Sequence, residues 1–423
     1  MNLGAICRSA MDPTPLLILD VPRGDASSEP LCEAIPWPAS EVLDVESIQR
    51  PARVLTVLGQ DLPAARTLAM RRRAARAFRA FEDAQTQPPS MSSGRVRTAM
   101  LLCAGLGTRL RPLTARLPKP AVPFFGAPLI RYSLALLQNA GIERVVINTH
   151  HLPDVMERVA RNEAERLGLT LEVSREPALQ DTAGGLRDAR ALIGRDAPFL
   201  LVNGDAFISI DLPELIARHR RSGAIASLAV VPPVPGESFR AIEADTSGRV
   251  ARIRGIGPER VGLSPWHFLG VHVLESDIFD AIPGKGPCDI NGEVYPSLIA
   301  RGALVEALPV RVGAWADLGT PRRYIEACEE LLTGLCDLAP LGAATPLNTG
   351  AISGAPGAHS FVDRSAVLER AVTLDGAIVG PDVHLGSGAR IRRAVLLPGV
   401  QVAAGARVEN ALVWPLGHLP IDR

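Results

Sequence analysis

Between residues 96 and 336, short hydrophobic runs alternate with longer segments whose hydrophobic residues recur every three or four positions. The short runs predict buried strands, and the periodic segments predict helices that bury one face. We expect strands at 98–104, 144–149, 170–174 and 198–203, and helices at 127–140, 152–167 and 182–193. Strands and helices that alternate at this spacing are typical of an α/β fold, in which helices cover both faces of a mostly parallel sheet.

A different pattern follows a turn-rich linker at 337–357. Segments 365–381, 382–398 and 399–415 are each 17 residues long and carry hydrophobic residues at equivalent positions. These residues are Leu368, Leu385 and Val402, then Leu374, Ile391 and Val408, with small residues at Gly386, Gly388, Ala403 and Gly405. Such repeats predict a hexapeptide-type parallel β-helix over 358–423, with about four stacked coils. We expect Trp414 to pack on its end.

The first 95 residues show no comparable pattern. Residues 64–83 predict a basic amphipathic helix, which is either solvated or faces a partner or a membrane surface. We expect 1–95 to be a poorly defined, loosely attached extension, or an artefact if translation starts at Met91 or Met100. The first 25 residues lack the hydrophobic segment of a signal peptide.

Composition narrows the functional classes. Basic and acidic residues balance at 45 each, so the total charge favours neither a nucleic-acid nor a membrane partner. No hydrophobic run reaches the length of a membrane span. Six scattered cysteines without a CxxC pair favour reduced thiols in the cytoplasm over disulfides or a zinc site.

The most informative stretch follows the first predicted strand: Gly105-Leu-Gly-Thr-Arg-Leu-Arg-Pro-Leu-Thr-Ala-Arg-Leu-Pro-Lys-Pro120. Glycines at a strand end expose backbone N–H groups that suit phosphate oxygens, and the arginines and Lys119 add positive charge. Lys119 is one of only two lysines in the chain. A dinucleotide fingerprint would need glycine in place of Leu110, and a Walker loop is absent. A glycine-rich turn with solvated arginines remains the simpler alternative.

Three further motifs lie near strand ends. Asp205 follows the strand 198–203 and offers a hard oxygen ligand for Mg²⁺, although an Asx turn would also explain it. Asp317 lies in Trp315-Ala-Asp-Leu-Gly-Thr-Pro321, where Thr320 and Pro321 make a good helix start; by itself it could be a capping or turn residue. In Ser174-Arg-Glu-Pro-Ala-Leu-Gln-Asp-Thr-Ala-Gly-Gly-Leu186, two glycines would let a flat ring approach; the alternative is a helix capped by Asp181 or Thr182.

Together, these motifs closely resemble those of the sugar-1-phosphate nucleotidylyltransferases, also called NDP-sugar pyrophosphorylases. The resemblance implies a Rossmann-like nucleotidyltransferase domain over 96–336, often followed by a left-handed β-helix. It implies that an NTP, GTP or UTP here, reacts with a sugar 1-phosphate in the presence of Mg²⁺. It also implies a possible homo-oligomer, in which the subunits contact each other through the β-helix.

The resemblance also implies roles for individual residues. It implies catalysis by Arg109 and Lys119 and metal binding by Asp205 and Asp317. The residues that it implies for nucleotide binding are Ala104, Gly105, Leu106, Gly107, Thr108, Glu176, Gly184 and Gly185. The residues that it implies for contacts with the sugar phosphate are Asn203, Gly270 and Trp315.

Some segments separate the branches of this family. Asn148-Thr-His-His-Leu152 resembles the N-acetylmuramate-1-phosphate uridylyltransferase-like branch, where we expect His150 and His151 to be structural. The β-helix instead resembles mannose-1-phosphate guanylyltransferases. Residues 237–250 predict a hairpin beside the sugar pocket, and 268–274 a strand. The E-K-P tripeptide of many relatives is missing, and 252–257 occupy its region.

Two other function classes remain open. A non-catalytic NDP-sugar-sensing subunit would usually lack the Arg, Lys or Asp that this chain retains. A hexapeptide acyltransferase needs a catalytic histidine between coils, and His384 is the only histidine within the three repeats.

Overall fold

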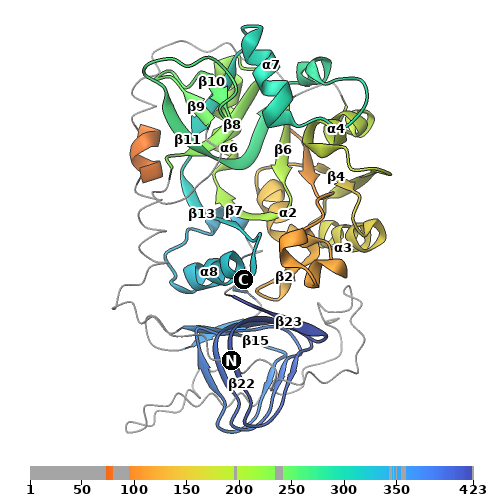
Figure 1. Ribbon diagram of the computed structural model, residues 1–423, viewed down its shortest axis with the longest axis vertical. Coiled ribbons are helices and arrows are strands. Elements are labelled where there is room, and N and C mark those ends of the chain that lie inside the picture. Colours follow the sequence, from red (N-terminus) through yellow and green to blue (C-terminus); the bar gives the residue numbers. More distant parts are fainter. Residues whose placement is uncertain are drawn as a thin grey trace.

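The computed structural model describes residues 73–79, 95–194, 198–233, 242–342, 345, 347–348, 350–353 and 359–421. Figure 1 shows an α/β body above a stack of short strands formed by the C-terminal residues. The first predicted strands and helices lie in the upper body, and the 17-residue repeats form the lower one.

A mixed sheet of nine strands forms the centre of the α/β body. Four parallel strands lie in the order β6 (Phe199–Asn203), β1 (Thr98–Leu102), β4 (Arg144–Thr149) and β5 (Thr170–Arg175). These are the four strands that the hydrophobic runs predicted. Because β1, β4 and β6 run parallel, the polar loops that follow them meet at one edge of the sheet. β11 (Ser264–Leu274) pairs antiparallel with β6.

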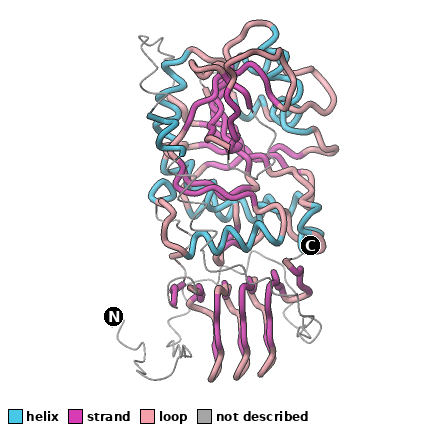
Figure 2. The backbone as a smooth tube through the Cα atoms, turned by 60° about the vertical axis from the view of Figure 1, so that its left-hand side comes forward, coloured by secondary structure: helices cyan, strands magenta, loops and turns pink. Residues whose placement is uncertain are grey.

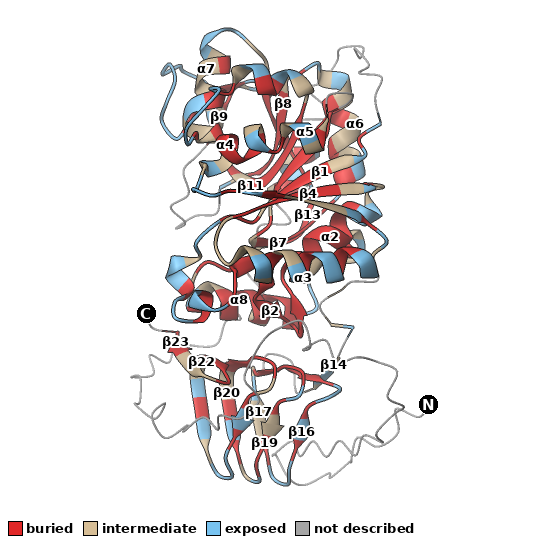
Figure 3. Ribbon diagram, turned by 90° about the vertical axis from the view of Figure 1, so that its right-hand side faces the viewer, coloured by how far each residue is buried: buried red, intermediate tan, exposed pale blue. Residues whose placement is uncertain are grey.

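The central strands β1, β4 and β6 contribute to two hydrophobic cores, one on each face of the sheet. Ala99 and Leu101 of β1 belong to one core, whereas Met100 belongs to the other, because successive side chains point to opposite faces. α2 (Ile130–Asn139) and α3 (Pro153–Arg166) cover the first face. α4 (Asp181–Asp188), α5 (Arg190–Ile193) and α7 (Tyr295–Ala300) cover the second (Figure 3). The prediction of helices on both faces is confirmed.

Parts of the helix prediction are wrong. Residues 127–128, expected to be helical, form the strand β3 (Ala127–Pro128), and α2 begins at Ile130. The helix expected at 182–193 is divided into α4 and α5 at Ala189. The alternative in which Asp181 or Thr182 caps the helix is not seen, because α4 begins at Asp181, after Gln180, without a side-chain cap. Asp181 has a φ of 60°, and its carboxylate accepts a hydrogen bond from the neighbouring backbone N–H of Thr182.

Smaller elements complete the upper body. The short hairpin β2 (Pro123–Phe124) and β3 (Ala127–Pro128) follows Lys119. β7 (Ala206–Ile210) pairs antiparallel with β13 (Val312–Asp317). Further strands and α-helices are β8 (Ala226–Val231), β9 (Ile242–Ala244), β10 (Val250–Ile253), β12 (Val305–Pro309), α6 (Leu212–Ser222) and α8 (Pro321–Leu332). β9 and β10 form the described part of the predicted hairpin; residues 237–241 lie outside the described residues.

A helix at 73–79 packs against the α/β body. Ala74 and Phe78 are buried, and the Phe78 ring lies against the guanidinium groups of Arg218 and Arg311, at 4.9 and 4.6 Å. Arg73 donates a hydrogen bond to the carbonyl of Pro233. For this segment the expected loose attachment is therefore wrong; the rest of 1–94 lies outside the described residues.

The C-terminal strands stack with a constant offset. Leu368 lies beside Leu385 and Leu385 beside Val402, and Leu374, Ile391 and Val408 align in the same way, each pair 17 residues apart. The predicted repeat is confirmed, and the coils are consistent with a parallel β-helix (Figure 2). The strands are β14 (Gly350–Ser353), β15 (Ser360–Asp363), β16 (Val367–Leu368), β17 (Thr373–Asp375), β18 (Ile378–Val379), β19 (His384–Leu385), β20 (Arg390–Leu396), β21 (Gln401–Val402), β22 (Arg407–Trp414) and β23 (Gly417–Pro420). The left-handed sense of the coil stays a prediction.

The two bodies share a packed interface. The rings of Phe125 and Phe361 meet edge to face, and Arg393 pairs with Glu329 of α8 at 2.6 Å. Trp414 is buried in the hydrophobic core that joins the bodies, where its ring lies against Gly417. Within the described ranges, no helix is both long and hydrophobic enough to span a bilayer.

Candidate active site

Three charged residues from distant parts of the sequence meet at the edge of the sheet. The ammonium group of Lys119 donates hydrogen bonds to Oδ2 of Asp205 and Oδ1 of Asp317, both at 2.9 Å. Lys119 follows the glycine-rich loop, Asp205 follows β6, and Asp317 ends β13. The two aspartates are close because Asp317 pairs with Ala206, the first residue of β7.

Burial differs within this cluster. The Lys119 side chain is only 6% exposed, whereas those of Asp205 and Asp317 are 45% and 22% exposed. A buried ammonium group needs anionic partners, and the two carboxylates supply them. Because the carboxylates stay accessible while Lys119 is covered, ligands from solvent would reach the aspartates first.

Asp317 receives more positive charge than Asp205. Arg323, at the start of α8, donates to its Oδ2 at 2.6 Å, and Nη2 of Arg109 lies 3.8 Å from the same oxygen. Burial alone would raise the pKa of Asp317, but Lys119, Arg109 and Arg323 outweigh that effect and lower the pKa below its usual value. Arg323 was not anticipated from the sequence; its place in the first turn after the Asp317 motif was the only signal.

The glycine-rich loop runs beside this cluster. Gly107 has a φ of 59°, and a side chain there would come within 3.1 Å of Thr114 and 3.4 Å of Lys119. The Thr114 hydroxyl donates to the carbonyl of Gly107 at 2.7 Å, which holds the turn closed. The loop thus needs glycine at 107 for both conformation and space. The side chain of a residue at 105 would meet open space, so that position is free to face a ligand.

The Glu176 segment is joined to the same loop through Asn148. Oε1 of Glu176 accepts from Nδ2 of Asn148 at 2.8 Å, and Oδ1 of Asn148 accepts from the backbone N–H of Cys103 at 2.8 Å. The other Glu176 oxygen accepts from the N–H of Gln180, just before α4. A side chain at Gly185 would lie 2.4 Å from Glu176, so glycine is required for this contact. Asn148 was quoted only within a motif and was not predicted as a site residue.

The residues predicted to contact the sugar phosphate come from three neighbouring strands. Gly270 of β11 lies against the side chain of Asn203, at the end of β6. The Trp315 indole N–H donates to the carbonyl of Leu269 at 3.1 Å, which brings β13 beside β11. The structure therefore brings this set together.

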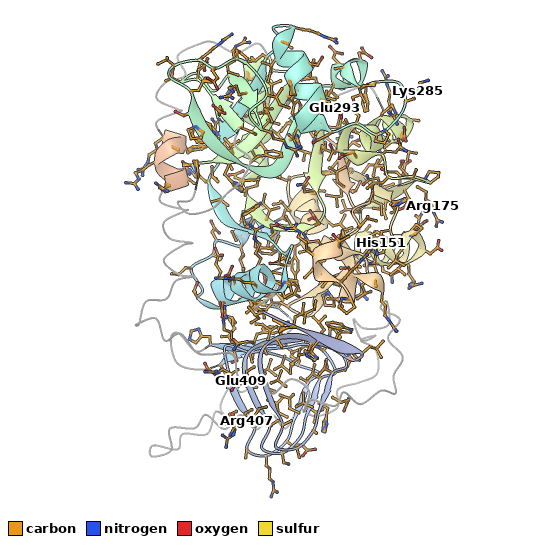
Figure 4. The ribbon with its side chains drawn as sticks, in the orientation of Figure 1. His151, Arg175, Lys285, Glu293, Arg407 and Glu409 are labelled. Atoms are coloured by element: carbon orange, nitrogen blue, oxygen red, sulfur yellow. The ribbon has the colours of Figure 1, made fainter. Side chains whose placement is uncertain are left out.

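The histidine pair after β4 makes backbone contacts. Nδ1 of His150 donates to the carbonyl of Glu176 at 3.0 Å, and Nε2 of His151 donates to that of Thr114 at 2.6 Å. Figure 4 labels His151 on the right-hand side of the α/β body. Both bonds connect loops of the candidate site, which agrees with the predicted structural role.

The segment that replaces the E-K-P tripeptide carries two paired arginines. Arg252 lies 3.3 Å from Glu243, and Arg254 pairs with Asp289. Because carboxylates already neutralise both side chains, this segment does not supply an obvious free cation in place of the lysine.

The two carboxylates at Lys119 are ligands of the kind that magnesium prefers. Mg²⁺ is usually held by one or two carboxylates, with phosphates and water completing its six ligands. Asp205 and Asp317 provide two carboxylates that already converge on one cationic nitrogen. Among the residues that the structure describes, no group of three or more His, Cys, Asp or Glu is arranged to bind a metal ion. A cavity of about 480 Å³ lies elsewhere, beside Ala75, Asp211 and Arg311.

Comparisons with known proteins agree with this arrangement. The nucleotidyl transferase family matches residues 98–334. A mannose-1-phosphate guanylyltransferase of Mycobacterium tuberculosis is 30% identical over 300 residues, which cover 70% of this chain and 79% of that protein. A probable mannose-1-phosphate guanylyltransferase of Oryza sativa is 32% identical over 71% of this chain and 79% of its own length.

A third relative is named for a different nucleotide and a different sugar phosphate. The UTP–glucose-1-phosphate uridylyltransferase of Synechocystis is 29% identical over 248 residues, which cover 56% of this chain and 63% of that protein. The family match spans more than half of the chain and contains the glycine-rich loop, Lys119, Asp205 and Asp317. The resemblance seen in the sequence is confirmed, and the chain belongs to the nucleotidyl transferase family.

Proposed function

We propose that this protein joins an NTP to a sugar 1-phosphate and releases an NDP-sugar and pyrophosphate. The observation that carries the proposal is the contact of Lys119 with Asp205 and Asp317 beside a glycine-rich loop. Family membership and the names of the relatives support the same reaction.

The reaction needs positioning and charge neutralisation more than it needs a base. The attacking phosphate oxygen is already anionic at neutral pH, so no proton has to be removed from it. Instead, the site must hold two anions together and stabilise charge at the α-phosphorus. The backbone N–H groups of 105–108 and the guanidinium of Arg109 would bind the β- and γ-phosphates, and Lys119 would lie near the α-phosphate.

Asp205 and Asp317 would hold Mg²⁺. When bound, Mg²⁺ would reduce the repulsion between the phosphates and neutralise the leaving pyrophosphate. The buried Lys119 ammonium would remain beside the carboxylates and orient toward the phosphate. The residues of the glycine-rich loop that would contact the nucleotide are Ala104, Gly105, Leu106, Gly107 and Thr108.

The nucleobase of the NTP and the sugar of the sugar 1-phosphate would contact two different sets of residues. Gly184 and Gly185, positioned by Glu176, would border the nucleobase. Asn203, Gly270 and Trp315 would border the sugar and its phosphate. The contacts among these residues support such a division, because each set is already held together in the protein.

GTP and mannose 1-phosphate are the first substrates to test, because the two guanylyltransferases match more of the chain than the uridylyltransferase does. Pyrophosphate release should be measured with four NTPs against mannose, glucose, N-acetylglucosamine and N-acetylmuramate 1-phosphates. Turnover with any pair supports the reaction class, and the fastest pair identifies the substrates. No turnover with any pair would favour a sensing subunit.

The proposed division of the chain is a nucleotidyltransferase domain at 96–336 and a β-helix at 358–423. We further propose that the β-helix is left-handed and provides contacts for a homo-oligomer, because stacked coils expose regular surfaces. The cytoplasm stays the predicted location.

A further inference from the structure

The backbone of Arg323 is held in place by neighbouring residues, whereas its side chain is accessible to solvent. Its backbone N–H donates to the Thr320 hydroxyl at 3.2 Å, and Pro321 begins the helix. The hydroxyl of the next residue, Tyr324, donates to the carbonyl of Pro123 and so ties α8 to the segment that follows Lys119. The Arg323 side chain is nevertheless 39% exposed, compared with 6% for Lys119.

The guanidinium of Arg323 binds Asp317, one of the two carboxylates that would hold the proposed metal. It donates to Oδ2 of Asp317 at 2.6 Å, while Lys119 binds Oδ1. A carboxylate that shares its charge with a divalent cation attracts a neighbouring arginine less strongly. The Arg323 guanidinium, which is partly exposed, would then be held less firmly by Asp317 and could also donate to a second anion.

The balance of charge indicates which anion that is. Lys119, Arg109 and Arg323 all lie within ion-pair distance of the two carboxylates, so three cationic groups gather at this point. A sugar phosphate alone carries about 1.5 to 2 negative charges at neutral pH, and an NTP carries more. Guanidinium groups match phosphate oxygens in a two-pronged geometry.

We propose that Arg323 is a further catalytic residue, which binds a phosphate oxygen of one substrate when Asp317 holds the metal. This inference rests on the proposed function of the same site. The phosphate could belong to the nucleotide or to the sugar, and the experiment below separates these sources.

The test compares Arg323→Gln and Arg323→Lys with Arg322→Gln. Arg322 is the adjacent arginine, but its side chain is 71% exposed and pairs with Glu326 one turn along α8, which makes it a matched control. For each protein, the dissociation constant of magnesium pyrophosphate, the KM of each substrate and the melting temperature should be measured.

For Arg323→Gln we expect the pyrophosphate dissociation constant or one KM to rise about 10- to 100-fold, the usual effect of losing a charged hydrogen bond. Arg323→Lys should recover part of the loss, and Arg322→Gln should match the wild type. A rise in the pyrophosphate constant and the NTP KM assigns Arg323 to the nucleotide, and a rise in the sugar 1-phosphate KM alone assigns it to the sugar.

The inference is overturned if Arg323→Gln lowers only the melting temperature, since Arg323 would then merely stabilise Asp317. Failure of the proposed function would look different, because the wild type itself would release no pyrophosphate from any substrate pair. In that case pyrophosphate binding decides the role of Arg323: a weaker dissociation constant in Arg323→Gln supports it, and an unchanged one overturns it.

Discussion

The ammonium nitrogen of Lys119 lies 2.9 Å from Oδ1 of Asp317, a residue 198 positions later in the chain. The contact joins the end of the glycine-rich loop to the last residue of β13. Because Asp205 binds the same nitrogen, one buried cation holds together three segments of the candidate site. Removing that cation should affect turnover and stability at the same time.

Replacing Lys119 with glutamine should lower kcat about 10²- to 10³-fold, the scale expected for one preorganised charge contact. It should also lower the melting temperature, because two carboxylates would lose their buried partner. Pyrophosphate release and thermal unfolding measure the two effects. Lys285, the only other lysine, lies on an outer loop in Figure 4, so Lys285→Gln is the matched control and should retain wild-type rates. Full activity in Lys119→Gln would show that the assignment is wrong.

Asp205→Asn should raise the concentration of Mg²⁺ that gives half-maximal activity, by about 10-fold or more. The amide keeps the shape of the side chain but loses the charge that attracts a divalent ion. The measurement is a magnesium titration of pyrophosphate release, together with calorimetric titration of Mn²⁺ in the absence of substrates. Asp382→Asn, at an exposed position in the C-terminal stack, is the control. Identical titrations for wild type and Asp205→Asn would rule out the ligand role.

Parts of the fold and of the candidate site could be predicted from the sequence because they follow from simple local patterns. The four buried strands follow from hydrophobic runs, and the pairing of Leu368 with Leu385 follows from a strict 17-residue repeat. Lys119, Asp205 and Asp317 were found through their motifs. Asn148 and Arg323 were not, because their importance comes from which side chain each one reaches across the fold. The division of α4 from α5 at Ala189 does not follow from the hydrophobic pattern, which predicts one helix over 182–193.

The helix at 73–79 should contribute measurably to stability. Phe78 is 3% exposed and its ring contacts two arginines, so Phe78→Ala should cost about 3 kcal/mol, near the lower end for buried aromatic residues. A chain that begins at Met91 should lose at least as much. Urea unfolding measures both, and Arg76→Ala on the exposed side of the same helix is the control. Equal stability of Phe78→Ala and wild type would mean that the helix is only loosely attached.

His272 should make the protein sensitive to mild acid. It is buried in β11 with Nδ1 hydrogen-bonded to the Tyr295 hydroxyl at 2.6 Å, and burial lowers its pKa to about 3. The unfolded chain has a histidine pKa of about 6.5, so between these values the unfolded state binds one more proton than the folded state. Stability from this residue is therefore complete above about pH 6.5 and is lost as the pH falls, by about 1.4 kcal/mol per pH unit.

The test is urea unfolding of the wild type, His272→Gln and Tyr295→Phe between pH 5 and 8. Other groups also titrate in this range, so the informative quantity is the difference in slope between proteins. His272→Gln should be less stable at pH 8 but lose less stability toward pH 5, because glutamine takes up no proton. Tyr295→Phe should keep the wild-type slope, since the buried histidine is still present. If His272→Gln follows the wild-type slope instead, another group causes the acid sensitivity.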